Sequence, residues 1–110
     1  MTCTEKQYIP IIRLKLNYED PEPINVGFAS IKPDLKCGDA YFEIEREDEA
    51  HYGIGQALAY RYGGRRVGLI IIVVNRYNEI VEFLRWVRSN FDLITKVVIC
   101  RDNDCEVIDT

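Results

Sequence analysis

Several features that mark particular protein classes are scarce in this sequence of 110 residues. The longest apolar run, Val67 to Val74, is far too short to span a bilayer. The polar stretch from Met1 to Gln7 lacks the apolar core of a signal peptide. These absences predict a cytoplasmic protein with no membrane partner, and the host cell of a mobile element is one such setting.

Excess positive charge is also missing, because the formal net charge is −4. This balance argues against a protein that binds nucleic acid by electrostatics alone. The charges are nevertheless unevenly placed, with acids concentrated between residues 34 and 49 and many arginines in the second half. One interpretation is a cationic rim around an acidic centre, and the other is ordinary solvated surface charge. The arginines of the second half are Arg61, Arg65, Arg66, Arg76, Arg85, Arg88 and Arg101.

Histidine and cysteine, two frequent metal ligands, are few. His51 is the only histidine, and we expect it to be a surface residue near a helix start. The four cysteines do not form the two close pairs of a zinc knuckle, since only Cys100 and Cys105 are near each other in the sequence. Buried free thiols, a disulfide and a metal–thiolate cluster that includes Cys3 and Cys37 remain open alternatives.

The first half of the chain shows strand-like patterns. Alternating apolar residues predict a strand near residues 12–18, and an irregular strand is expected over 24–36. After a tight turn at Cys37-Gly38-Asp39, Ala40 to Arg46 reads as a third strand. These strands would form a three-stranded antiparallel meander, preceded by a reduced N-terminal helix that Pro10 ends early.

The second half alternates helices and strands. The predicted elements are a helix over 48–62 with Glu47 or Asp48 as its cap, a buried strand over 67–74, a helix over 77–90, a strand over 95–101 and a short edge strand over 106–108. Together with the meander, this order predicts a single α/β domain over residues 1–110, built on one mixed sheet with a right-handed crossover.

Three acids fall where such a sheet would gather them. On the strand "AYFEIER", Glu43 and Glu45 share one face and stand ~7 Å apart along the backbone. Pairing around Gly38 brings Asp34 towards Glu43. Carboxylates packed this closely repel one another, and a divalent cation relieves that repulsion; oxygen ligands favour Mg²⁺ or Mn²⁺. The alternative is the solvated side of an exposed hairpin.

The following helix carries polar residues at helical spacing. Tyr52, Gln56 and Tyr60 lie at i, i+4 and i+8 and therefore share a face. If buried, these side chains need hydrogen-bond partners, which an acidic cluster on the sheet would supply. The alternative is an ordinary helix surface. Trp86, which lies off the apolar stripe of the next helix, is either a contact for DNA or a second subunit, or is buried against a strand.

In this order, Pro33-Asp34, the E-x-E of Glu43 to Glu45 and the Q-x-x-x-Y of Gln56 to Tyr60 resemble the PD-(D/E)XK nuclease superfamily. The Q-x-x-x-Y pair is similar to that of its RecB-type branch. The resemblance covers roughly residues 25 to 75 and implies a restriction-endonuclease-like core. It also implies a metal-dependent nuclease that hydrolyses DNA.

The resemblance assigns roles to named residues. Asp34 and Glu43 would bind Mg²⁺ (or Mn²⁺), with the Ile44 carbonyl as third ligand, and Glu45 would orient or deprotonate the attacking water. Gln56 and Tyr60 would support these acids or contact the nucleic-acid backbone. Residues expected to hold DNA phosphates are Arg61, Arg65 and Arg66.

Two departures from the family pattern keep alternatives open. Most members carry lysine where this chain has Glu45, but some restriction-type members use glutamate there. Lys32, Lys36 or Arg46 could also reach in from a neighbouring position. A reduced N-terminal helix would leave one side of the sheet for a second copy, which predicts a homodimer. An inactive nuclease-fold accessory subunit that binds DNA, and an adaptor that binds other proteins, are the alternative functions.

Overall fold

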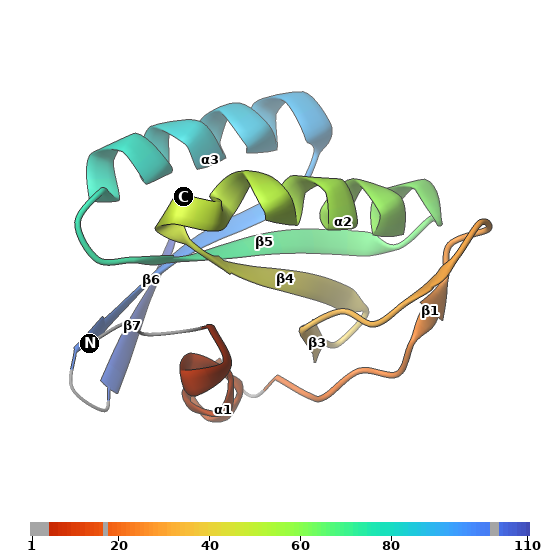
Figure 1. Cartoon of the computed structure of the whole chain (residues 1–110), viewed down its shortest axis with the longest axis horizontal. Coiled ribbons are helices and arrows are strands. Elements are labelled where there is room, and N and C mark those ends of the chain that lie inside the picture. Colours follow the sequence, from red (N-terminus) through yellow and green to blue (C-terminus); the bar gives the residue numbers. More distant parts are fainter. Residues whose placement is uncertain (1–4, 17, 102–103) are drawn as a thin grey trace.

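The computed structural model describes residues 5–16, 18–101 and 104–110, of which residues 5–8, 15 and 16 are described by their backbone alone. Cys3 lies outside this part. A five-stranded mixed sheet forms the centre of the domain, with strand order β3-β4-β5-β6-β7. Its strands are β3 (Leu35–Cys37), β4 (Ala40–Arg46), β5 (Arg66–Val73), β6 (Ile94–Arg101) and β7 (Asp104–Asp109). The three central strands run parallel, and β3 and β7 pair antiparallel at the two edges (Figure 1).

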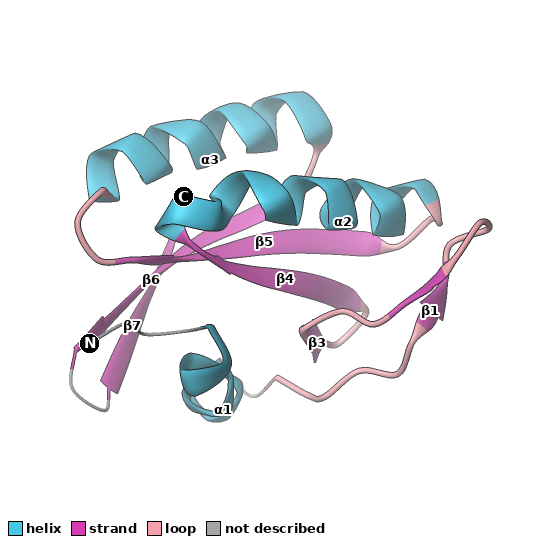
Figure 2. Ribbon diagram, in the orientation of Figure 1, coloured by secondary structure: helices cyan, strands magenta, loops and turns pink. Residues whose placement is uncertain are grey.

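Helices cover both faces of this sheet (Figure 2). Helices α2 (Ala50–Tyr62) and α3 (Tyr77–Phe91) lie on one face, and α1 (Glu5–Leu16) lies on the other. A 3₁₀ turn over Glu47–Glu49 leads into α2. None of the described helices combines the length and the apolar character needed to cross a membrane.

The second half of the domain confirms the predicted elements to within two residues. Strand β5 is buried along Val67–Val73, because α2 and α3 cover one face and α1 packs towards the other. Each large aliphatic side chain buried there contributes about 1.5–3 kcal/mol of hydrophobic stabilisation. The apolar stripe of α3 places Ile80, Leu84 and Val87 in the core. Strand β4 matches its predicted bounds, and the Gly38-Asp39 turn before it uses a glycine with a φ of 61°.

The first third of the chain corrects the prediction. The expected strand near residues 12–18 is wrong, because residues 5–16 form α1, which continues through Pro10. The N-terminal helix is therefore present rather than reduced. In the helix Ile12 is fully buried against the sheet while Leu14 is 87% exposed, so helical rather than strand periodicity decides which side chains are buried.

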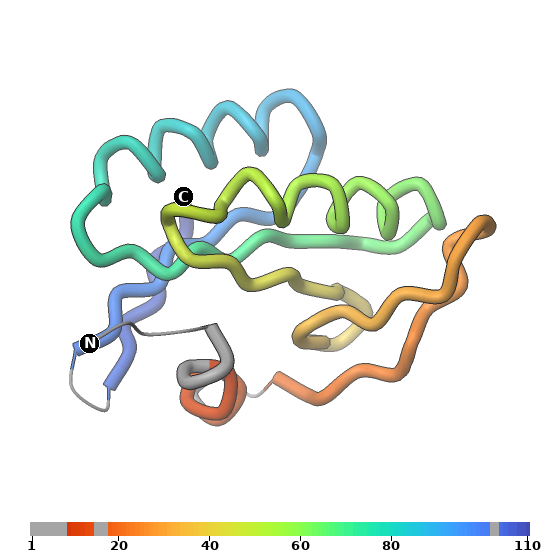
Figure 3. Tube along the Cα trace, in the orientation of Figure 1, coloured from red at the N-terminus to blue at the C-terminus, as the bar shows by residue number. Residues whose placement is uncertain are grey.

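The expected second strand is also divided. Strands β1 (Ile24–Asn25) and β2 (Ser30–Ile31) form a separate small hairpin, and only β3 joins the main sheet. The three-stranded meander is thus reduced to the β3–β4 hairpin. The chain trace shows the β1–β2 hairpin standing beside the C-terminal end of α2 (Figure 3). Val26 lies 3.2 Å from the position where a Cβ on Gly63 would stand, so a larger residue at position 63 would require Val26 to shift by a few tenths of an ångström.

Two further details settle alternatives left open by the sequence. Cys100 and Cys105 face each other on β6 and β7 and form a disulfide, while Cys37 is a half-buried free thiol. Neither Glu47 nor Asp48 caps α2. The Glu47 carboxylate instead accepts hydrogen bonds from the backbone N–H groups of residues 74–76, at the start of α3. Burial opposes its ionisation, but these donors hold the pKa of Glu47 below its ordinary value.

Candidate functional site

Glu43 is the most buried acid of the sheet, with only 3% of its surface exposed. It lies on β4 and points to the face covered by α2, where the hydroxyl of Tyr60 donates a 2.9 Å hydrogen bond to its Oε1. Tyr60 itself is fully buried. A carboxyl group inside this apolar layer therefore has a fixed partner from the helix, as the sequence predicted for a buried tyrosine.

Asp34 lies opposite Glu43, directly before the neighbouring strand β3. The β3–β4 register pairs Leu35 with Phe42, and the backbone N–H of Asp34 extends this ladder by donating to the Phe42 carbonyl at 3.1 Å. The backbone N–H of Ile44 donates to Asp34 Oδ2 at 2.8 Å. A hydrogen bond also joins the carboxyl groups of Asp34 and Glu43. The predicted approach of these two acids is confirmed.

The two carboxyl groups determine the charge of the site. Burial, and then the negative charge of Asp34, raise the pKa of Glu43 to about 9, although the Tyr60 hydroxyl opposes the shift. Burial and the Glu43 carboxyl raise the pKa of the Tyr60 hydroxyl as well. At neutral pH, Glu43 therefore retains a proton next to Asp34, an arrangement that avoids two adjacent negative charges.

Glu45 occupies the next position on the same strand face. Its charge adds to the raised pKa of Glu43, so it lies within electrostatic range of the pair. Its side chain packs under α2, where a Cβ on Gly53 would stand 2.8 Å from Glu45 Cγ. The glycine at position 53 thus provides the space that the third acid occupies. We define the acid site as Asp34, Glu43, Glu45 and Tyr60.

The acid site meets part of the chemistry expected for a divalent cation. Within residues 5–16, 18–101 and 104–110, no group of three or more His, Cys, Asp or Glu side chains is arranged to hold a metal ion. Asp34 and Glu43 nevertheless interact directly, and a bound cation would relieve the repulsion between two ionised carboxylates at this spacing. Carboxylate oxygens are the ligand type that a hard cation such as Mg²⁺ or Mn²⁺ prefers.

Other predicted members of the site lie elsewhere. Gln56, one helical turn before Tyr60, is exposed to solvent. Two of the cations proposed to substitute for the family lysine have acidic partners, since Arg46 pairs with Asp48 and Lys32 approaches Asp20. The third, Lys36, lies over the ring of Tyr41.

The remaining candidates from the sequence lie on the surface. His51 is exposed and contacts the ring of Tyr52. Trp86 is 55% exposed and meets Phe91 edge to face. Neither side chain belongs to the acid site, in keeping with the expectation of a surface histidine.

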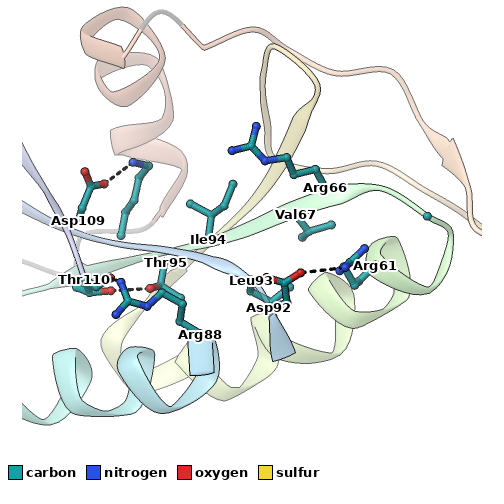
Figure 4. A pocket seen from close by; sticks show the side chains of 12 residues that line it. Arg61, Arg66, Val67, Arg88, Asp92, Leu93, Ile94, Thr95, Asp109 and Thr110 are labelled. Atoms are coloured by element: carbon teal, nitrogen blue, oxygen red, sulfur yellow. Dashed lines mark hydrogen bonds and ion pairs between the residues drawn. The ribbon is translucent and has the colours of Figure 1, made fainter. Parts of the chain in front are cut away.

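The predicted phosphate-binding arginines line two other pockets. Arg61 and Arg66 border a cavity of about 680 Å³ beside the starts of β5 and β6 (Figure 4). Arg65 and Arg66 border a second cavity of about 460 Å³ beside the β3–β4 turn. None of the acid-site residues lines either cavity. The sequence did not single out Lys96 and Thr95, which share the larger cavity, because β6 lies outside the resembling segment.

Comparison with family models, with curated proteins and with solved structures gave no match. The geometry of the acid site and of the two basic cavities is therefore the basis for the functional argument.

Proposed function

We propose that this chain is a metal-dependent nuclease that hydrolyses DNA phosphodiester bonds at the acid site. The observation that carries the proposal is the Asp34–Glu43 carboxyl pair, in which Asp34 is half-buried and Glu43 is buried and bonded to Tyr60. The order of α1, the β3–β4 hairpin, α2 and the parallel strand β5 supports a restriction-endonuclease-like core of the PD-(D/E)XK type.

Each residue of the proposed site has a separate role. Asp34 and Glu43, with the Ile44 carbonyl, would hold Mg²⁺ or Mn²⁺, which when bound stabilises charge on the scissile phosphate and lowers the pKa of a bound water. Tyr60 fixes the rotamer of Glu43 through its hydroxyl. Glu45, on the same strand face, would accept a proton from the attacking water. Glu43 must first release its own proton to act as a ligand.

A second candidate is an inactive nuclease-fold subunit that binds DNA. Glu45 stands where most members of the resembling superfamily carry lysine, and the described part of the chain offers no third side-chain ligand beside the carboxyl pair. In this case, the protonated pair is a structural feature of the sheet rather than a metal site. The homodimer also remains a prediction, although α1 covers the second face of the sheet.

The experiment that tests the proposal is isothermal titration of Mn²⁺ into the wild type and Glu43→Gln at pH 6, 7 and 8, with cleavage of plasmid and of single-stranded DNA measured on the same samples. Glu82→Gln, at an exposed position of α3, is the matched control. We expect wild-type affinity to rise about tenfold per pH unit, because Glu43 loses its proton on binding. Binding and cleavage should disappear in Glu43→Gln and persist in Glu82→Gln.

The possible outcomes separate the candidates. Metal binding without cleavage of any DNA form favours the inactive subunit. If wild type shows no saturable Mn²⁺ binding but binds DNA in a salt-sensitive manner, the acid site is structural and the nuclease proposal is rejected. Absence of both activities returns the chain to the adaptor alternative. Size-exclusion chromatography of the same samples decides whether the protein is a dimer.

A further inference from the structure

One end of the domain concentrates positive charge, although the whole chain has a net charge of −4. The two basic cavities lie where the β3–β4 turn, the α2–β5 loop and the start of β6 come together. Six basic but only three acidic side chains line them. We call this surface the basic end; its basic residues are Lys36, Arg61, Arg65, Arg66, Arg88 and Lys96, and its acidic residues are Asp39, Asp92 and Asp109.

Two ion pairs of the basic end are accessible to a competing anion. Arg66 pairs with Asp39 at 3.3 Å, and the two side chains are 65% and 81% exposed. Arg61 similarly pairs with Asp92, which is 89% exposed (Figure 4). Exposed pairs of this kind contribute little to stability, so a phosphate can replace the carboxylate at small cost.

Two cations of the basic end have no carboxylate partner among the described residues. Lys36 and Arg65 both lie over the ring of Tyr41, at 5.7 and 6.0 Å from its centroid. The ring holds these side chains at the surface beside Arg66 and leaves their N–H groups available. The second cavity therefore presents donors to solvent rather than a closed network.

An exposed aromatic pair borders the same end. Phe28, at the tip of the β1–β2 hairpin, and Tyr62, in the last turn of α2, are 72% and 77% exposed. Their ring centroids are 6.2 Å apart and the planes are tilted by 50°. Tyr62 follows Arg61 directly and precedes Gly64, which borders both basic cavities. Two rings this exposed bury little apolar surface in the isolated chain.

We propose that the basic end and the Phe28–Tyr62 pair form a binding surface for single-stranded DNA. The arginines contact successive phosphates and the two rings stack on unpaired bases, the combination that single strands require. A duplex keeps its bases stacked internally and offers no ring to Phe28 or Tyr62. This surface would make single-stranded DNA the substrate class of the proposed nuclease. The choice of DNA as the partner rests on that proposed function.

The test is fluorescence anisotropy of a labelled oligothymidylate of about 15 nucleotides in EDTA, which excludes metal-dependent cleavage. We expect Phe28→Ala and Tyr62→Ala each to weaken binding at least about fivefold. Tyr52→Ala, which removes an equally large exposed ring near the other end of α2, is the matched control and should bind like wild type. All three positions are solvent-exposed, and circular dichroism verifies that the variants fold.

The charge component is measured separately. Arg65→Ala and Arg66→Ala should lower the affinity and reduce the slope of log K against log[salt] by about 0.7 for each lost phosphate contact, whereas Arg85→Ala should leave both unchanged. The proposal is overturned by absence of saturable binding, by equal losses in Tyr62→Ala and Tyr52→Ala, or by a duplex that competes as well as the single strand. Binding in EDTA by a protein that fails to cleave would reject the nuclease proposal but keep this one.

Discussion

The acid site and the basic end both gather charged side chains, but they differ in burial. At the acid site Glu43 is 3% exposed, keeps a proton at neutral pH and has a fixed hydroxyl partner. At the basic end, Arg66 and Asp39 are both more than half exposed and pair across solvent. A buried group changes the stability of the fold when its charge changes, whereas an exposed pair changes mainly what the surface attracts.

The largest expected effect is the pH dependence caused by Glu43. Because its folded pKa of about 9 exceeds the ordinary value of 4.5, the folded state binds the proton more tightly. This contribution to stability is fully present below pH 4.5 and is lost as pH rises towards 9, at up to about 1.4 kcal/mol per pH unit. Urea unfolding should show Glu43→Gln to be more stable than wild type at pH 8.5 and nearly equal at pH 4.5. If the free energies of unfolding of the two proteins changed with pH in parallel, a buried proton at this position would be contradicted.

Substitution of a buried and of an exposed glycine tests the same difference between buried and exposed positions. In Gly68→Ala the new Cβ would stand 2.3 Å from the Phe42 ring and 3.0 Å from the Ile94 carbonyl, so we expect a loss of about 1–3 kcal/mol. Gly55 lies on the exposed face of α2, where a new Cβ would have no neighbour within 4 Å. Gly55→Ala should therefore stabilise the protein by up to about 1 kcal/mol. Chemical denaturation measures both, and an unaffected Gly68→Ala would show that the sheet relaxes there.

A smaller effect is expected when the partner of Glu43 is removed. Tyr60→Phe keeps the buried ring but deletes the hydroxyl bonded to Glu43, and should cost about 1–2 kcal/mol. The pKa of Glu43 should rise further, because that hydroxyl lowers it in the wild type. NMR titration of the carboxyl carbon reports the pKa directly. Tyr77→Phe, at a partly exposed position of α3, is the control and should leave the Glu43 pKa unchanged.

The smallest effect is expected at the basic end. Asp39→Asn breaks the exposed ion pair with Arg66, and unfolding measurements should detect no more than about 0.5 kcal/mol. The same change should strengthen binding of single-stranded DNA, because it removes a competing carboxylate. A loss of stability comparable to that of Tyr60→Phe would remove the distinction between the two regions.

Much of the fold followed from local patterns, and the exceptions have identifiable causes. The apolar stripe of α3 and the continuous apolar run of β5 predicted both elements closely. Residues 12–16 alternate like a strand, yet they form a helix because Ile12 packs in the core on the sheet face opposite α2 and α3. The cap predicted for α2 was wrong because Glu47 finds three backbone donors near α3, far along the chain.

In the candidate site, too, local sequence patterns predicted some side-chain positions, and packing between distant segments decided the others. Strand alternation and the turn at Gly38 were enough to place Asp34 beside Glu43. Helical spacing put Gln56 and Tyr60 on one face, but the rotation of α2 against the sheet buries only Tyr60. The separation of Arg61, Arg65 and Arg66 from the acids was not visible in the sequence, since it depends on which end of the sheet the α2–β5 loop reaches.

The sequence by itself determined the elements whose hydrophobic period is satisfied locally, and it determined that Glu43 and Glu45 share one sheet face with Asp34 close to Glu43. The tertiary structure decided which of those acids is buried, which helix face supplies its partner, and that the arginines gather at another end with Phe28 and Tyr62. The physical reason is that period and turn chemistry act over a few residues. Burial, and with it the protonation of Glu43, depends on layers contributed by distant parts of the chain.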